Sequence, residues 1–510
     1  MKRISYCNSF ARLASLCVVF LLITSTLFAQ RHTTARNMGL GGGGTAYMGD
    51  YHANFINPAN LMLGDRNAAI GLFGGISTLG GGNLADMSIY NEYFTTGRTL
   101  NEQLTMEISD KLFGSSPNGS RSIGANLDAV LFGINLKKGN QAVSAAFRMR
   151  ALSSLTMSKG FFELSMGGLN ELYFNEYKNV DVSADMLMVG EVSVGYAREV
   201  WSSGTFGQQG SKRLYAGVSP KLLLGMNYYR TSFQSQLRIS ENEMLLSHVF
   251  DYNVESTGQV SQQLNDYHAD RNTSGLDPVF GDYLILDDAA SDLGSIKGRG
   301  LGLDMGVTYE MVMPSVPFLG GDYQVLRLSL SATDMGSVNF SQDAGSFRGV
   351  GQFDWSGTRL DSEYIDAEHD SKFSNYSSHL QDSIATHIYG NYSPEDIASL
   401  NVGLSPMLNF GAAYTAGKWN LMFDLGKGMN SRGMNSQVIS SVLGVEYNLI
   451  NIIPLRTGMR VGGDMPTAFS FGTGINLKFL DFTVGFMSTP NLHDNNLSVG
   501  AAWSGLVMRF

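Results

Sequence analysis

The last fifty-six residues of the chain, 455–510, alternate between bulky apolar side chains and small or polar ones. In the middle of this stretch the bulky series is Phe469, Phe471, Thr473, Ile475 and Leu477, and the intervening series is Ser470, Gly472, Gly474 and Asn476. A period of two predicts β-strands, because successive side chains of a strand point to opposite faces. A soluble sandwich would bury the bulky face, whereas a transmembrane barrel would turn it toward lipid. The alternation therefore predicts strands and leaves both folds open.

The first 29 residues have the organisation of a secretory signal peptide. Lys2, Arg3 and Arg12 make the start basic, and residues 13–28 are predominantly apolar. We expect cleavage after Ala29, where a small residue is needed. The apolar run is short for a span of about 20 residues and is diluted by Ser and Thr, which disfavours a transmembrane anchor. Cys17 does not indicate a lipoprotein, because the preceding residue is a large leucine and the apolar run continues past it.

Both cysteines, Cys7 and Cys17, lie within the predicted signal peptide, so the mature chain relies on packing and hydrogen bonds rather than disulfides. The whole chain has 35 basic and 45 acidic residues, and loss of the three basic signal residues leaves a net charge near −13. This balance argues against nucleic acid as a partner, which would need a basic surface.

After the signal, no apolar run is long enough for a membrane helix. Membrane barrels use shorter and less hydrophobic segments, because closed strand pairing satisfies their backbone. The 60 glycines fit a chain of many strands and turns.

Residues 30–66 do not alternate and predict a compact, irregular segment. Gly41 and Gly42 belong to a run of four glycines, which permits positive φ and close backbone approach. Further on, Asn57, Pro58, Ala59 and Asn60 form an N-P-A-N motif, and the residue before proline favours a turn. A phosphate-binding loop is disfavoured, because the glycines lack the Lys-Ser/Thr of a Walker motif and no strand precedes them.

This glycine run, followed by N-P-A-N and then by a strand-rich chain, resembles the FadL-type outer-membrane transporter superfamily, and more closely its uncharacterised Bacteroidetes-type branch. The resemblance implies a barrel of about 14 strands, with residues 30–66 folded inside it as a hatch and residues 67–510 forming the wall. It also implies passage of hydrophobic molecules such as fatty acids or aromatic hydrocarbons. A similar branch serves instead as a barrel component of type IX protein secretion. Individual residues match the family only over about 36–61. In the rest of the chain the resemblance lies in the strand pattern.

Turn lengths predict the orientation of such a barrel. Residues 123–136 and 142–152 flank the polar turn 137–140 and predict a hairpin. The segments 241–298 and 340–399 are long and polar, and we expect them to be extracellular loops opposite short periplasmic turns. A short amphipathic helix is predicted over residues 100–112.

Searches for catalytic and metal-binding patterns give no strong candidate. The mature chain contains no nucleophile elbow, zincin helix, Walker loop or complete dinucleotide fingerprint. Histidines 369, 379 and 387 match no metal-ligand spacing, and the acidic run at 287, 288 and 292 lacks the pattern of a calcium loop. We therefore predict a non-enzymatic protein with no cofactor and no metal. An outer-membrane hydrolase stays open, since its residues would come from different strands.

Three basic residues alternate with the apolar series, and a barrel would place them in its lumen: Arg456, Arg460 and Lys478. We expect them to pair with lumen acids, because a charge in a crowded interior needs a partner. The apolar phase changes between Trp503 and Leu506, and a bulge at Ser504-Gly505 would reconcile the two phases.

The sequence thus predicts an all-β transmembrane barrel, and the resemblance implies that it takes up hydrophobic small molecules passively. Its expected partners are outer-membrane lipids, the barrel insertion machinery that reads a final Phe510, and a hydrophobic ligand. One alternative is a component of a secretion or assembly system with a secreted-protein partner. A second alternative is a soluble secreted β-protein.

Overall fold

The computed structural model describes residues 34–64, 66–81, 84, 86–95, 97, 101–205, 207–240, 245–273, 294–314, 324–355, 392–395, 397–433, 435–463, 466–477, 479–490 and 497–510. The predicted signal peptide, Lys478, the three loop histidines and the acidic run at 287–292 lie outside these residues.

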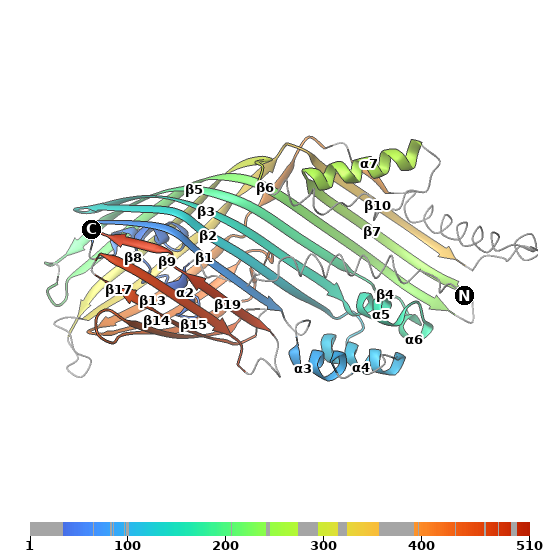
Figure 1. The fold of residues 1–510 in the computed structure, drawn as a ribbon, viewed down its shortest axis with the longest axis horizontal. Coiled ribbons are helices and arrows are strands. Elements are labelled where there is room, and N and C mark those ends of the chain that lie inside the picture. The colour runs from blue at the N-terminus through green and yellow to red at the C-terminus, as the bar shows by residue number, and fades with distance from the viewer. Residues whose placement is uncertain are drawn as a thin grey trace, which may run out of the picture.

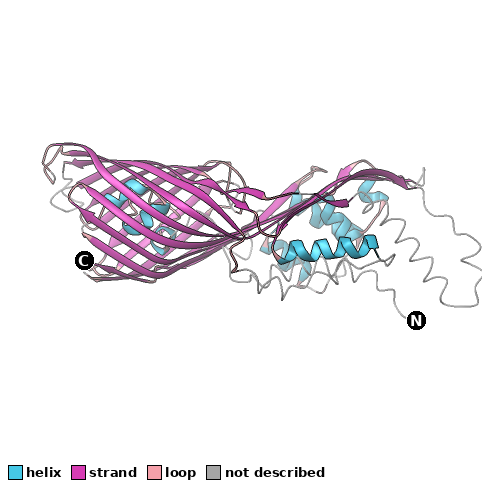
Figure 2. Cartoon of the chain, turned by 90° about the horizontal axis from the view of Figure 1, so that it is seen from above, coloured by secondary structure: helices cyan, strands magenta, loops and turns pink. Residues whose placement is uncertain are grey.

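In the described part of the chain, fourteen strand positions close into an antiparallel barrel (Figures 1 and 2). In order around the wall they are β1 (Ala68–Gly81), β2 (Ser120–Lys138), β3 (Gln141–Ser158), β5 (Val182–Ser203), β6 (Lys212–Ser240), β8 (Gly298–Met313), β9 (Gln324–Phe340), β13 (Met407–Ala416), β14 (Trp419–Gly428), β15 (Ser440–Asn448), β16 (Pro454–Gly462), β17 (Ala468–Asn476), β18 (Leu480–Ser488), and a last position shared by β19 (Ser498–Trp503) and β20 (Leu506–Arg509). β19 and β20 both pair with β1, which closes the ring. The predicted antiparallel barrel of about 14 strands is confirmed.

The alternation in the sequence corresponds to the two faces of the wall. In β17, Phe469 and Phe471 are 48% and 53% exposed, whereas Ser470 between them is buried. The outward face carries large apolar side chains around the ring: Val194, Leu222, Leu301, Leu330, Phe410, Phe423, Leu443, Phe469, Phe471 and Phe486. Such a surface would be unfavourable in water but suits hydrocarbon, so the barrel has the outer face of a membrane-spanning one.

The last strand position is interrupted at Ser504 and Gly505, as the phase change in the sequence predicts. Gly505 has a φ of 65°, and a Cβ atom there would lie 2.0 Å from the Leu72 carbonyl oxygen. Only glycine fits this combination of positive φ and close approach. The bulge returns the later residues to the outer face, where Trp503, Leu506 and Phe510 are all exposed.

The two ends of the barrel differ in their connections. At one end β2 and β3 are joined by the two-residue turn Gly139–Asn140, with Gly139 at a φ of 63°. β13 and β14 are likewise joined through residues 417–418. At the other end the connections carry further strands and helices, which form a lobe beyond the barrel rim (Figure 1). The predicted asymmetry between short turns and long connections is present.

The lobe contains ordered elements where the sequence predicted only long loops. Within 241–298 lie β7 (Leu245–Thr257) and α7 (Gln259–Thr273), and within 340–399 lie β10 (Ala344–Trp355) and β11 (Tyr392–Glu395). β6 continues past the rim and pairs with β7, which pairs with β10, which pairs with β11. α7 covers one face of this sheet through a core of Val254, Leu264 and Phe347. The prediction of long polar loops did not include these elements, because a strand with one polar face resembles a polar loop in composition.

Smaller elements complete the lobe: α3 (Met87–Ile89), the π-helix η4 (Tyr90–Phe94), α4 (Glu102–Phe113), α5 (Lys159–Gly167), α6 (Glu171–Phe174), β4 (Lys178–Asn179) and β12 (Leu400–Gly403). α4 corresponds to the helix predicted over 100–112, and it begins where the Asn101 side chain accepts a hydrogen bond from the Leu104 amide. Phe113 of α4 packs on Phe162 of α5, with ring centroids 5.6 Å apart. Within the residues described, no helix has the length and apolarity needed to span a membrane.

The N-terminal segment, residues 34–63, lies inside the barrel (Figure 2). It contains α2 (Ala35–Met38) and two 3₁₀ helices, η1 (Asp50–Phe55) and η2 (Pro58–Met62). Eleven strand positions face it with glycines at which a Cβ atom would lie within 3 Å of the segment: Gly71, Gly133, Gly195, Gly217, Gly306, Gly411, Gly444, Gly458, Gly472, Gly485 and Gly500. The small residues of the alternation therefore make room for a second chain segment in the lumen.

Candidate functional site

The N-P-A-N motif makes hydrogen bonds both within the N-terminal segment and with the barrel wall. Asn57 caps η2 by accepting a hydrogen bond from the Ala59 amide at 3.1 Å, and Pro58 occupies the first helical position, where no amide is needed. The Asn57 amide donates to the Thr308 hydroxyl of β8 at 2.9 Å, and that hydroxyl donates to Asn60 Oδ1 at 2.6 Å. The motif thus fixes a turn and a wall contact at once.

The same two asparagines hold the preceding loop. The Asn57 and Asn60 amides both donate to the Thr45 carbonyl oxygen, at 3.1 and 2.8 Å. Both side chains are fully buried. Because a buried carbonyl without a donor is costly, these two contacts stabilise the path of the chain from the glycine run to η2.

Replacing Asn57 with Ala is expected to lower the free energy of unfolding by about 2–4 kcal/mol, since it removes a helix cap and leaves buried groups without partners. Urea-induced unfolding in lipid vesicles measures the change. Asn101→Ala is the matched control, because the exposed Asn101 side chain caps α4 of the lobe, and its loss costs about 1 kcal/mol. Equal effects of the two variants would contradict the bridging role of Asn57.

The glycine run allows the chain to turn toward a wall carboxylate. Gly41, Gly42 and Gly44 have φ values of 77°, 92° and 119°. The Gly44 and Thr45 amides both donate to the Asp424 carboxylate of β14, at 2.9 and 2.8 Å. A side chain at these glycines would be strained, and the carboxylate satisfies two buried amides.

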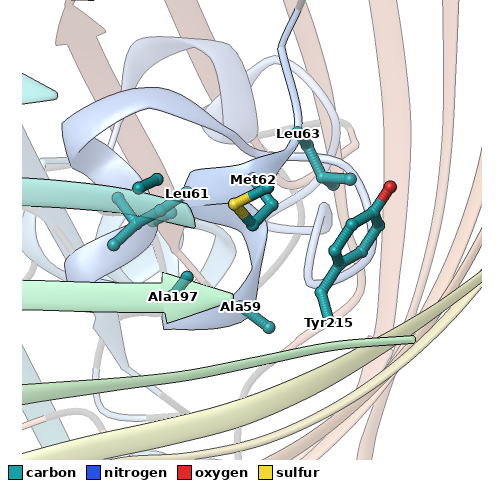
Figure 3. Packing of buried hydrophobic residues seen from close by; sticks show 8 residues of the cluster. Ala59, Leu61, Met62, Leu63, Ala197 and Tyr215 are labelled. Atoms are coloured by element: carbon teal, nitrogen blue, oxygen red, sulfur yellow. The ribbon is translucent and has the colours of Figure 1, made fainter. Parts of the chain in front are cut away.

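Apolar contacts hold η2 on the side of β5 and β6. Ala59, Leu61, Met62 and Leu63 lie beside Ala197 of β5 and Tyr215 of β6, and Figure 3 shows this cluster. All are buried. Ala59, the third residue of the motif, therefore has a packing role.

Of the predicted lumen cations, Arg456 makes the most extensive contacts. Its guanidinium lies 2.6 Å from the Glu446 carboxylate, and both side chains are about 1% exposed. The N-terminal segment approaches the same carboxylate through Arg36, at 3.2 Å. Arg460 is also buried in β16 and donates to the Ser498 hydroxyl at 3.1 Å, while Lys478 is not among the described residues.

A contact that the sequence analysis missed joins the N-terminal segment to the last barrel strand. Arg509 of β20 lies 2.7 Å from the Asp50 carboxylate and 2.5 Å from that of Asp481 in β18. Asp50 adopts a positive φ of 62°, unusual for a residue other than glycine. The ion pair holds η1 at this point of the wall.

A second missed feature is a buried network of charges, which we call the charge cluster. It contains three cations and four carboxylates from six strands: Asp128 (β2), Arg148 and Arg150 (β3), Glu191 (β5), Lys221 (β6), Asp304 (β8) and Asp334 (β9). Lys221 lies 2.7 Å from Asp304, 2.8 Å from Asp334 and 3.4 Å from Glu191. Each charge in the cluster has an opposite partner, as burial requires.

The N-terminal segment also contacts the charge cluster through an aromatic ring. The Arg148 guanidinium lies over the Phe55 ring at 4.1 Å from its centroid, and the Lys221 ammonium lies at 5.6 Å. Phe55 thus covers one side of the network, in a cation–π arrangement.

A family model described as "Family of unknown function (DUF5723)" matches residues 58–488. The chain belongs to this family. The matched residues include most of the N-P-A-N motif and nearly the whole barrel of this DUF5723 member. A search of curated proteins finds no match.

Among solved structures, several are similar to the DUF5723 chain over most of its length. The Ralstonia pickettii toluene transporter TbuX has 12% identity and a TM-score of 0.43, with 94% of this chain and 98% of that chain covered. The P. putida toluene transporter TodX has 10% identity and a TM-score of 0.42, with 94% and 98% covered. A Pseudomonas aeruginosa FadL homologue has 9% identity and a TM-score of 0.38, with 95% and 99% covered.

Within the described residues no group of three or more His, Cys, Asp or Glu side chains is arranged to hold a metal ion. Glu191, Asp304 and Asp334 of the charge cluster instead pair with Arg and Lys. The candidate site is therefore a lumen that contains the N-terminal segment, and polar contacts join this segment to the wall on several sides.

Proposed function

We propose that the chain is an outer-membrane channel for passive uptake of small hydrophobic molecules. Residues 30–66 act as a hatch and residues 67–510 form the barrel. One observation carries the proposal: the N-terminal segment fills the lumen and, among the described residues, no strand pairing joins it to the wall. Side-chain contacts hold it, so it can move without breaking the barrel.

The position of the apolar lumen residues supports a lateral path for the solute. The charge cluster makes the side near β3, β6 and β9 unfavourable for an apolar molecule. Besides the packing of η2 on β5 and β6, the segment makes apolar contacts with the wall near β1 and the last strand position, where Met38 packs with Ile76 and Ala502. A hydrophobic solute would therefore pass along this side.

The wall is irregular at the same place. Phe73 of β1 has a φ of 55°, the β2–β3 register shifts between Val130 and Phe132, and the adjacent last position is broken at Ser504 and Gly505. We infer that this seam is where a solute leaves the lumen for the bilayer after the hatch moves.

The outward apolar face and the predicted signal peptide support outer-membrane lipids and the barrel insertion machinery as partners. The short turns would face the periplasm and the lobe would face the outside. The proposed activity is non-enzymatic and needs no cofactor.

Locking the hatch to the wall is expected to abolish uptake. The Asn54 amide donates to the Ser144 hydroxyl of β3 at 3.0 Å. A disulfide between cysteines at these two positions would tie the hatch to the wall, and the predicted mature chain contains no other cysteine. Cells producing the oxidised Asn54→Cys/Ser144→Cys variant should take up radiolabelled toluene no faster than cells without the protein. Dithiothreitol should restore uptake.

The Asn54→Cys single variant is the matched control and should show the same uptake in oxidising and reducing conditions. A cross-linked variant that transports at the wild-type rate would overturn the role of the hatch. Mass spectrometry of molecules that co-purify with the detergent-extracted protein identifies the ligand class.

The lobe favours a second candidate, a barrel component of a secretion or assembly system. It has its own packed cores, including one of Ile89, Tyr93, Ile108 and Phe113, and so offers a rigid surface to a protein. Recovery of a secreted protein with the purified barrel, together with wild-type behaviour of the cross-linked variant, would favour this candidate. A soluble secreted protein is disfavoured by the outward apolar face; heat-modifiable gel migration tests it.

A further inference from the structure

A small chamber lined by both polar and apolar side chains lies beside the N-terminal segment, at the lobe end of the lumen. Its volume is about 80 Å³, which corresponds to roughly two or three water molecules. Asn37 and Thr45 of the N-terminal segment line one side, and Asp128, Arg150 and Asp334 of the charge cluster line another.

The connection between β14 and β15 bounds the chamber on the lobe side. Arg432 and Asn435 of this connection line the chamber. Arg432 reaches across to the Asp185 carboxylate of β5, at 2.9 Å. The Asn435 amide donates to the Pro406 carbonyl oxygen at 3.3 Å. The chamber therefore lies between the N-terminal segment and this connection.

Several oxygens that line the chamber have no hydrogen-bond partner in the described part of the chain. They are Asn126 Oδ1, Asp128 Oδ1, Ser405 Oγ and Asn435 Oδ1. Asp128 and Ser405 are 8% and 5% exposed, so water outside the barrel does not compensate them. A buried polar atom without a partner costs about 1–3 kcal/mol.

The orphaned atoms share one chemical character. Three are pure acceptors, and the fourth is a hydroxyl that also accepts. The Asn435 amide nitrogen donates hydrogen bonds to Pro406 and Asn430, so the Oδ1 atom is the one without a partner. A species that satisfies this set must donate hydrogen bonds or carry positive charge.

The charge balance favours a positive charge. The charge cluster contains three cations and four carboxylates, which leaves one negative charge in excess. Asp128 uses Oδ2 for Arg148, at 3.2 Å, while its Oδ1 is unpartnered. Asp128 thus offers this negatively charged cluster a carboxylate oxygen without a hydrogen-bond partner.

We propose that the chamber binds one monovalent inorganic cation, with Asp128 as its charged ligand and Asn126, Ser405 and Asn435 as neutral oxygen ligands. A divalent cation fits less well, because calcium takes six to eight oxygens with several carboxylates. The bound ion neutralises the charge cluster and links β2 to the β14–β15 connection. It thereby stabilises the closed state of the lumen.

Thermal unfolding of the detergent-solubilised full chain tests the proposal. The buffers contain sodium, potassium or N-methyl-D-glucamine chloride at one ionic strength, so that screening is equal. The glucamine cation is too large for the chamber. Sodium or potassium should raise the wild-type Tm saturably, by roughly 2 °C or more over glucamine.

The Asp128→Asn and Ser405→Ala variants should each lose most of this difference, and Ser405→Ala changes no charge. Asp251→Asn, which removes an exposed carboxylate of the lobe, should retain it. Equal Tm values of the wild type in the three salts would overturn the proposal and leave a proton or water as the neutralising species. An undiminished effect in both Asp128→Asn and Ser405→Ala would place the cation elsewhere and overturn it equally.

Discussion

Replacing Lys221 with Met is expected to lower the free energy of unfolding by about 3–5 kcal/mol, because breaking a buried ion pair leaves uncompensated charge. The Lys221 ammonium is completely buried and is shared by Asp304, Asp334 and Glu191. Its loss leaves four carboxylates with only two arginines. Urea-induced unfolding in lipid vesicles, followed by tryptophan fluorescence, measures the change.

Lys111→Met is the matched control. Lys111 also pairs with two carboxylates, those of Glu92 and Glu107, but its side chain is 40% exposed. An exposed pair contributes about 0–1 kcal/mol, so this variant should unfold nearly as the wild type does. If Lys221→Met were as mild as Lys111→Met, the charge cluster would not be a tightly coupled buried network.

Replacing Gly217 with Val is expected to open the lumen. A Cβ atom on Gly217 of β6 would lie 2.4 Å from the Pro58 carbonyl carbon, in the backbone of η2. Backbone cannot rotate away as a side chain can, so the N-terminal segment must shift. Overpacking costs about 1–3 kcal/mol, which raises the population of the displaced state about 5- to 150-fold.

Single-channel recording in planar bilayers measures this opening as more frequent conducting events. Gly403→Val is the control, because a Cβ atom at Gly403 of β12 would meet no atom within 4 Å. The barrel wall should stay intact in both variants. Heat-modifiable gel migration, which depends on strand pairing, checks this. If Gly217→Val conducted no more often than the wild type, the segment would adjust locally without leaving its place, and the prediction would be wrong.

The barrel could be predicted because its signal is local. Each strand repeats the two-residue alternation, and even the interruption at Ser504-Gly505 is visible as a change of phase. Arg456 and Arg460 could be identified because they lie within one regular strand, β16. The N-P-A-N motif could be found because its four residues are consecutive.

The charge cluster could not be predicted in the same way. Asp128 and Asp334 are separated by about two hundred residues, and each is a single charge in an otherwise ordinary strand. They meet Arg148 only because barrel closure and strand register bring them to one height in the lumen. Asp50 and Arg509 are separated further still, and nothing local to either predicts the ion pair.

The split last strand has a consequence for the order of assembly. β19 and β20 close the ring on β1, and Arg509 of β20 binds Asp50 of the N-terminal segment. The segment is synthesised before the wall that surrounds it, yet this anchor exists only after the final strand has paired. The part of the chain made first is therefore secured last, and ring closure and seating of the segment are coupled at one residue.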